Sequence, residues 1–130
     1  MPVTALYASL LAPLYLILTI RIVSMRFGAR IALGDGGDKT LQKRIRAHGN
    51  FAEYVPYALV LLALAENLGA AHWVLHLSGA ALLIGRHAHA IALSGEKQIL
   101  KLRMAGMMLT FTALVVAATA CLWGALTHGI

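Results

Sequence analysis

Several polar side chains in one stretch of the sequence are spaced so that a helix would bring them to one side. They are Arg46, Asn50, Glu53, Tyr54 and Tyr57. At about 100° per residue, these positions fall within an arc of roughly 100° around the helix axis. A carboxylate can bind an ammonium group, and a guanidinium can bind a carboxylate as a two-point fork. This polar stripe therefore indicates a site for a small ligand that carries both kinds of charge.

Arg86 is expected to reach the same depth as the polar stripe. A short turn at residues 69–71 would fold the apolar segments on either side into an antiparallel hairpin, which sets Arg86 level with Tyr54. An ionisable group inside a membrane is costly and marks a candidate functional site. A purely structural Glu53–Arg86 ion pair is the alternative, because it would neutralise both groups without any ligand.

Arg26 and Arg103 lie where apolar segments end or begin. Arg103 shares a helix face with Gly106 and Thr110, so that helix offers a cation, a close-approach surface and a hydroxyl to the same space. One interpretation is a cationic cluster near the inner membrane face. The other is that these long side chains simply snorkel toward water, and spacing alone does not choose between the two.

The chain offers no side chain suited to act as a nucleophile in this region. Cys121 lies toward the opposite side of the membrane from the polar stripe and is expected to pack as a small hydrophobic residue. His72 and His76 share a helix face, but no third ligand accompanies them, so no metal site is expected. His89 follows Arg86 by three residues and is expected to approach the stripe. Any nucleophile must therefore arrive with the ligand.

Composition shows what kind of molecule positions these residues. Of the 130 residues, 60% are hydrophobic and 12% are charged, whereas soluble globular proteins average roughly 45–50% and about 25%. A water-soluble enzyme is thereby excluded, and the single cysteine excludes a disulfide scaffold. Four segments are long and apolar enough to cross the hydrocarbon layer. We predict one domain over residues 1–130, an all-α integral membrane protein whose four-transmembrane-helix up-down bundle has helices over residues 3–26, 41–68, 72–93 and 100–126.

The placement of the basic residues predicts the orientation of this bundle. Lys and Arg are concentrated in the two longer connections, whereas the turn at residues 67–71 and both terminal segments carry none. Because positively charged loops stay in the cytoplasm, both termini are expected outside it. The net charge of +6 is then mainly a topology signal beside anionic lipid headgroups, and nucleic acid is not an expected partner.

The polar stripe belongs to a longer pattern, Arg46-Ala-His-Gly-Asn50-Phe-Ala-Glu53-Tyr54-Val-Pro56. This R-x-x-x-N-x-x-E-Y-x-P pattern resembles that of the MAPEG family, the membrane-associated proteins in eicosanoid and glutathione metabolism. The likeness extends over the whole chain and is greatest to the short bacterial members. It implies a homotrimer in a bacterial inner membrane, with glutathione bound between neighbouring subunits in the cytoplasmic half of the bilayer.

The resemblance also implies roles for individual residues. Arg103 matches the family arginine that stabilises the glutathione thiolate, and Lys101 is the alternative because the register across the preceding loop is open. His89 joins the set through its spacing from Arg86. The expected glutathione-binding residues are Arg26, Arg46, Asn50, Glu53, Tyr54, Arg86 and His89.

The reaction implied is attack by a glutathione thiolate on a lipophilic electrophile that approaches through the lipid. A free thiol has a pKa of about 8.5, and nearby guanidinium groups favour its thiolate at neutral pH. The expected function is therefore a glutathione transferase or peroxidase, with glutathione as co-substrate and no metal.

Two other functions stay open. The family's eicosanoid-forming enzymes carry tyrosines after the third-helix arginine, where this chain has His89 and Leu93. These departures leave a non-catalytic membrane protein of the same fold that binds a lipid or a partner protein. A small transporter or channel subunit would instead use Arg86 and Glu53 as pathway residues, but the intact stripe favours glutathione.

Overall fold

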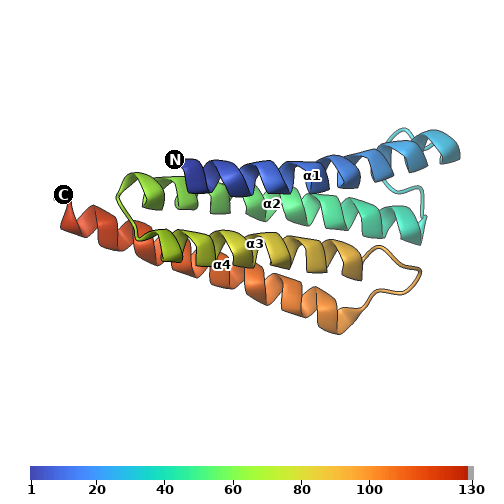
Figure 1. The fold of residues 1–130 in the computed structure, drawn as a ribbon. Coiled ribbons are helices and arrows are strands. Elements are labelled where there is room, and N and C mark those ends of the chain that lie inside the picture. Colours follow the sequence, from blue (N-terminus) through green and yellow to red (C-terminus); the bar gives the residue numbers. More distant parts are fainter. Residues whose placement is uncertain (129–130) are drawn as a thin grey trace.

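The computed structural model describes residues 1–128 and contains four helices in an antiparallel, up-down order. They are α1 (Pro2–Ala29), α2 (Lys39–Asn67), α3 (His72–Ala92) and α4 (Leu100–Thr127). The chain ends and the short α2–α3 turn lie at one end of the bundle, and the two longer connections lie at the other (Figure 1). The expectation of an all-α fold is confirmed.

The helix boundaries follow from local sequence signals. α1 starts at Pro2, a residue suited to the first turn, and it ends where Arg30 takes a left-handed conformation with φ 54°. α2 starts at Lys39, ahead of the expected residue 41, because Asp38 caps it. One Asp38 carboxylate oxygen accepts hydrogen bonds from the backbone N–H groups of Thr40 at 2.7 Å and Leu41 at 3.0 Å.

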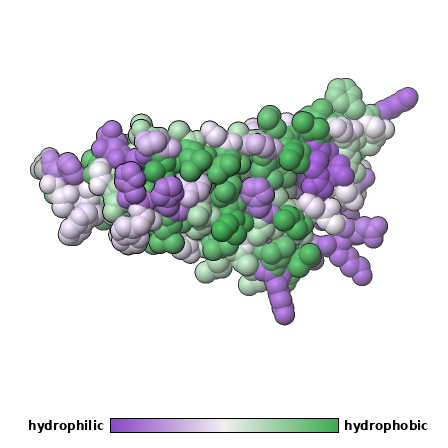
Figure 2. Space-filling model, viewed as in Figure 1, coloured by the Kyte–Doolittle hydropathy of each residue, from purple (hydrophilic) through white to green (hydrophobic). Residues whose placement is uncertain are grey.

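Apolar side chains cover much of the outer surface of the bundle. Figure 2 shows hydrophobic residues over the middle of the molecule and hydrophilic residues concentrated at its two ends. Among the described residues, α1 and α4 are long and apolar enough to cross a membrane by length and composition. Membrane crossing by α2 and α3 stays a prediction.

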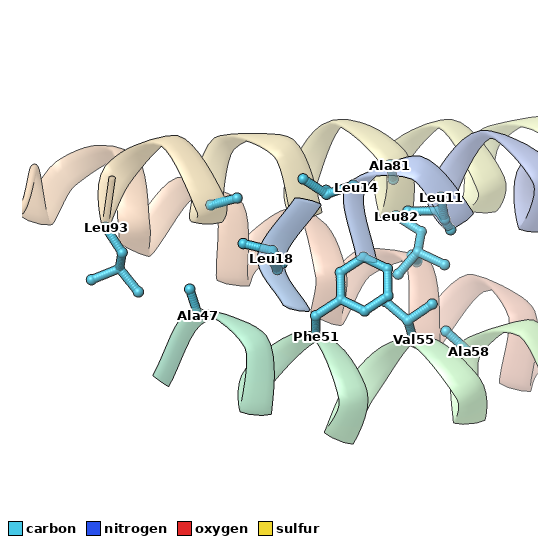
Figure 3. Close-up of a cluster of buried hydrophobic side chains, with 12 residues drawn as sticks. Leu11, Leu14, Leu18, Ala47, Phe51, Val55, Ala58, Ala81, Leu82 and Leu93 are labelled. Atoms are coloured by element: carbon cyan, nitrogen blue, oxygen red, sulfur yellow. The ribbon is translucent and has the colours of Figure 1, made fainter. Parts of the chain in front are cut away.

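The core is built mainly where α2 faces α1 and α3. Phe51 and Val55 of α2 are buried in a cluster with Leu11 and Leu18 of α1 and Leu82 of α3, and the close-up in Figure 3 shows these side chains converging from the helices. Because Phe51 and Val55 must face inward, the rotation of α2 about its own axis is fixed. That rotation decides which members of the polar stripe are buried.

α3 and α4 approach each other to backbone contact at two glycines. A Cβ atom added to Gly106 would lie 2.7 Å from the carbonyl oxygen of Gly85, and one added to Gly85 would lie 2.8 Å from that of Gly106. Such close approach is typical of small residues between membrane helices. It places Arg86 and His89, which flank this contact on α3, directly against α4.

Side-chain hydrogen bonds join the helices at the end of the bundle that carries the N-terminus and the α2–α3 turn. The carboxylate of Glu66 in α2 accepts hydrogen bonds from the backbone N–H groups of Val3 and Thr4 and from the hydroxyl of Thr4. It thereby caps the N-terminus of α1, where a negative charge is favourable. His76 lies within hydrogen-bonding distance of the Tyr7 hydroxyl at 3.1 Å, and residues 1–128 contain no cluster of metal-ligating residues.

Candidate functional site

Arg86 is buried inside the bundle and is held by two neighbouring helices. The residue is 2% exposed. Its Nη1 donates a hydrogen bond to Oδ1 of Asn50 in α2 at 2.5 Å, and its Nη2 lies 3.4 Å from Sδ of Met107 in α4. Its Nε has no hydrogen-bond partner, and no carboxylate pairs with it within residues 1–128. A buried cation without a counter-charge is costly and favours an anionic ligand.

Glu53 does not supply the missing counter-charge. Its Oε1 lies 3.8 Å from Nη1 of Arg46, which stands about two turns earlier on the same face of α2. The side chains of Glu53 and Arg46 are 57% and 56% exposed. The alternative of a structural Glu53–Arg86 ion pair is therefore wrong. An exposed pair of this kind contributes about 0–1 kcal/mol, so its partners remain available to a ligand.

Some residues of the polar stripe are buried in the core of the bundle, and others are exposed on its surface. Asn50 is buried at 4% exposure, and Tyr54 is half-buried with its ring 5.8 Å from that of Phe111 in α4. Tyr54 follows Asn50, the hydrogen-bond partner of Arg86, by one turn of α2. The stripe thus presents an amide and a phenol to the interior. The charged side chains of Arg46 and Glu53 and the phenol of Tyr57 face outward from the single chain.

A basic cavity of about 580 Å³ lies at the end of the bundle that carries the longer connections. Arg46 and Arg103, which are far apart in the sequence, both line this cavity. Lys101 is exposed and is not part of its lining. The lining residues are Lys39, Thr40, Gln42, Lys43, Arg46, Leu93, Glu96, Gln98 and Arg103.

Along α3, His89 lies between the buried Arg86 and Leu93, which lines the basic cavity. It is 2% exposed and packs against the Gly106 position of α4, where an added Cβ would lie 2.8 Å from the His89 backbone nitrogen. Gly106 follows Arg103 by three residues in α4, and His89 follows Arg86 by three residues in α3. The structure therefore brings Arg46, Asn50, Tyr54, Arg86, His89 and Arg103 into one region of a single chain.

Nearly the whole chain matches known proteins. The MAPEG family model matches residues 4–123. This chain belongs to the MAPEG family. It is similar to the inner membrane protein YecN of Escherichia coli K12 and to that of Escherichia coli O6:H1, with 40% identity over 121 residues in each case. The matched region covers 93% of this chain and 91% of each relative. The resemblance found in the sequence is confirmed, and the fold is that of a membrane helical bundle.

Arg26 lies apart from the other expected site residues of this MAPEG chain. It lines a separate hollow of about 460 Å³ at the end of α1, together with Arg30 and the apolar side chains of Val23, Phe27 and Ile31. It is not among the residues that line the basic cavity. Within one chain, the structure therefore does not bring Arg26 to Arg46 or Arg103.

Sequence reasoning about this MAPEG chain missed Met107, Lys43 and Gln98. Met107 contacts the buried Arg86, and Lys43 donates hydrogen bonds to the backbone carbonyl oxygens of Gly95 and Glu96. These contacts depend on how α4 packs and how the α3–α4 connection returns across α2. The sequence carries no spacing signal for either, because the partners lie on different elements.

Proposed function

We propose that this protein is a membrane-bound glutathione transferase or peroxidase that acts on lipophilic electrophiles. The observation that carries the proposal is the basic cavity, which has Arg46 and Arg103 in its lining. Asn50, the partner of the buried Arg86, follows Arg46 by one turn of α2. Membership of the MAPEG family supports glutathione as the co-substrate.

The charges of the site suit glutathione, which has two carboxylates, one ammonium group and one thiol. Glu53 can bind the ammonium, and the arginines can bind the carboxylates as two-point forks. The Arg46–Glu53 pair is long at 3.8 Å and more than half exposed. Exchanging it for contacts with a ligand costs little, because such pairs contribute about 0–1 kcal/mol. Free Glu53 and Arg46 are thus compatible with a loaded site.

Arg103 is the residue that we assign to the thiol. Its guanidinium favours the thiolate over the thiol, whose pKa is otherwise about 8.5. In the transferase reaction, the thiolate sulfur bonds to an electrophilic carbon and the displaced group leaves with the electron pair. In the peroxidase reaction, it attacks a peroxide oxygen and an alcohol leaves, and a second glutathione converts the sulfenic acid to a disulfide and water. Binding and charge stabilisation are the work of the protein.

A homotrimer with sites shared between subunits is part of the proposal. Glu53 and Tyr57 face outward on α2, in the stretch that we expect at membrane depth, where polar groups are costly against lipid. A neighbouring copy would cover them. Its α1 would also supply Arg26, which lies apart from the basic cavity within one chain. We further propose four membrane crossings in a bacterial inner membrane, with both termini outside the cytoplasm.

A second candidate function is a non-catalytic membrane protein that binds a lipid or a partner protein. The observation that favours it is Leu93, a buried apolar residue in the lining of the basic cavity. The family's eicosanoid-forming enzymes have a tyrosine in the matching place. The name of the relatives, inner membrane protein YecN, states a location and no reaction.

Titration of purified, detergent-solubilised protein with glutathione decides between the two. The ultraviolet absorbance of the thiolate is followed for the wild type, Arg103→Ala, Arg86→Ala and Glu53→Ala, with Lys101→Ala as a matched control on the same turn of α4. The proposal expects thiolate in the wild type and Lys101→Ala, and its loss in Arg103→Ala. Binding without thiolate favours the non-catalytic protein, and no binding at all overturns the glutathione proposal.

A further inference from the structure

The connection between α3 and α4 is tied to the other two helices. Nη1 of Arg21 in α1 donates a hydrogen bond to Oγ of Ser94 at 2.7 Å. Nζ of Lys43 in α2 donates to the backbone carbonyl oxygens of Gly95 at 2.7 Å and Glu96 at 2.6 Å. Glu96 of this connection lines the basic cavity. Contacts with both α1 and α2 therefore position the residues that follow, up to the start of α4.

Gln98 lies at the end of this tied connection and contacts Arg103. Its side-chain Oε1 accepts a hydrogen bond from Nη1 of Arg103 at 3.0 Å, and both residues line the basic cavity. Arg103 stands in the first turn of α4, where the helix dipole disfavours a cation. A long guanidinium side chain also loses considerable rotamer freedom when it is fixed. Arg103 therefore needs a partner if it is to stay over the cavity.

The chemical type of this partner matters as much as its position. An amide oxygen accepts the hydrogen bond and leaves the full positive charge of the guanidinium in place. A carboxylate at the same position would hold Arg103 equally well but would neutralise it, as in an ordinary ion pair. Glu96 also lines the cavity, yet its backbone oxygen, not its carboxylate, is the group held by Lys43.

We propose that Gln98 is a positioning residue that holds Arg103 over the basic cavity without neutralising its charge. The inference rests on the proposed function, in which Arg103 stabilises the glutathione thiolate. Gln98 does not touch the reacting atoms. It sets where the positive charge of Arg103 lies, and the α3–α4 connection, tied by Lys43 and Arg21, sets where Gln98 lies.

The test measures the pH at which half of the bound glutathione is thiolate, together with kcat and KM for glutathione. Gln98→Met keeps the side-chain length but removes the acceptor, and Gln98→Glu keeps the acceptor but adds a negative charge. We expect both to raise the midpoint by about one pH unit and to lower kcat about tenfold. For Gln98→Met we expect KM to change less than about twofold, because Arg46 and Glu53 still bind the ligand.

Asn67→Met is the control, because Asn67 is an exposed amide at the other end of α2 and does not line the basic cavity. It is expected to titrate like the wild type. Wild-type midpoints in both Gln98 variants, or an equal shift in Asn67→Met, overturn the role of Gln98 alone. If the wild type itself forms no thiolate, the proposed function fails and the role of Gln98 fails with it. A raised midpoint in Gln98→Glu with a normal one in Gln98→Met also overturns positioning, because added charge alone would explain it.

Discussion

Arg86 and Asn50 are joined inside the bundle by a hydrogen bond of 2.5 Å, which links α3 to α2, and no carboxylate of residues 1–128 pairs with the arginine. The guanidinium is satisfied by an amide oxygen and a methionine sulfur, and its Nε is left without a partner. A buried cation that lacks a counter-charge favours the binding of an anionic ligand. The pair is therefore both a structural contact and the innermost part of the candidate site.

Replacing Asn50 with leucine is expected to destabilise the protein by about 2–3 kcal/mol, because it leaves the buried Arg86 with one fewer acceptor. Thermal unfolding in detergent measures the effect. Asn67→Leu is the control, since Asn67 lies at the exposed end of the same helix and should change stability by less than about 0.5 kcal/mol. Equal losses in the two variants would show that the Asn50–Arg86 bond contributes nothing specific.

Glu53→Gln is expected to weaken glutathione binding about tenfold while changing the stability of the protein by less than about 0.5 kcal/mol. The reason is that its pair with Arg46 is long and exposed, whereas a bound ammonium group would be held by a full carboxylate charge. Isothermal titration calorimetry measures the affinity. Glu96→Gln removes the same charge from the lining of the basic cavity and should leave binding intact; a loss there as large as in Glu53→Gln would count against the ammonium assignment.

Gly106→Ala is expected to destabilise the bundle by about 1–3 kcal/mol, as overpacking does in a tight core. The added Cβ would lie 2.7 Å from the Gly85 carbonyl oxygen and 2.8 Å from the His89 backbone nitrogen, and neither backbone atom can move alone. Gly28→Ala, where an added Cβ meets nothing within 4 Å, is the control and should be neutral or slightly stabilising. Chemical unfolding of both variants provides the measurement, and similar stabilities would refute the contact.

The spacing of the polar stripe correctly predicts that Arg46, Asn50 and Glu53 share a helix, but it cannot predict that the core boundary divides them. That division depends on the rotation of α2, which is set by Phe51 and Val55 packing against α1 and α3. The helical periodicity of 3.6 residues shows which residues share one side of a helix. It does not show which of them a neighbouring helix will cover. For this reason the sequence left the Glu53–Arg86 ion pair open, and only the structure excludes it.

The four-helix organisation was easier to predict than the loops. The length of the apolar segments indicates the helices directly, and prolines and turn residues indicate where they begin and end. The cap formed by Asp38 and the contact between Gln98 and Arg103 depend instead on local backbone geometry. Gly85 and Gly106 could be recognised as small residues in the sequence. Their pairing across α3 and α4 could not, because the register between two membrane helices is set by packing.

The last prediction concerns Arg26, which lines a hollow of its own and not the basic cavity that contains Arg46 and Arg103. If each site takes Arg26 from one subunit and the cavity from its neighbour, chains that carry Arg26→Ala and chains that carry Arg103→Ala should complement each other. Each variant alone has only defective sites. In a trimer that contains both variants, about one third of the sites combine an intact Arg26 with an intact Arg103.

Co-expression with two different affinity tags isolates the mixed oligomers, and glutathione thiolate absorbance counts the functional sites. Arg46→Ala mixed with Arg103→Ala is the control. Because both residues line the same cavity of one chain, every site in that mixture lacks one of them, and no recovery is expected. Recovery in both mixtures would mean that the basic cavity is itself shared between chains. An absence of recovery in the Arg26 mixture would mean that Arg26 acts within its own chain or takes no part in the site.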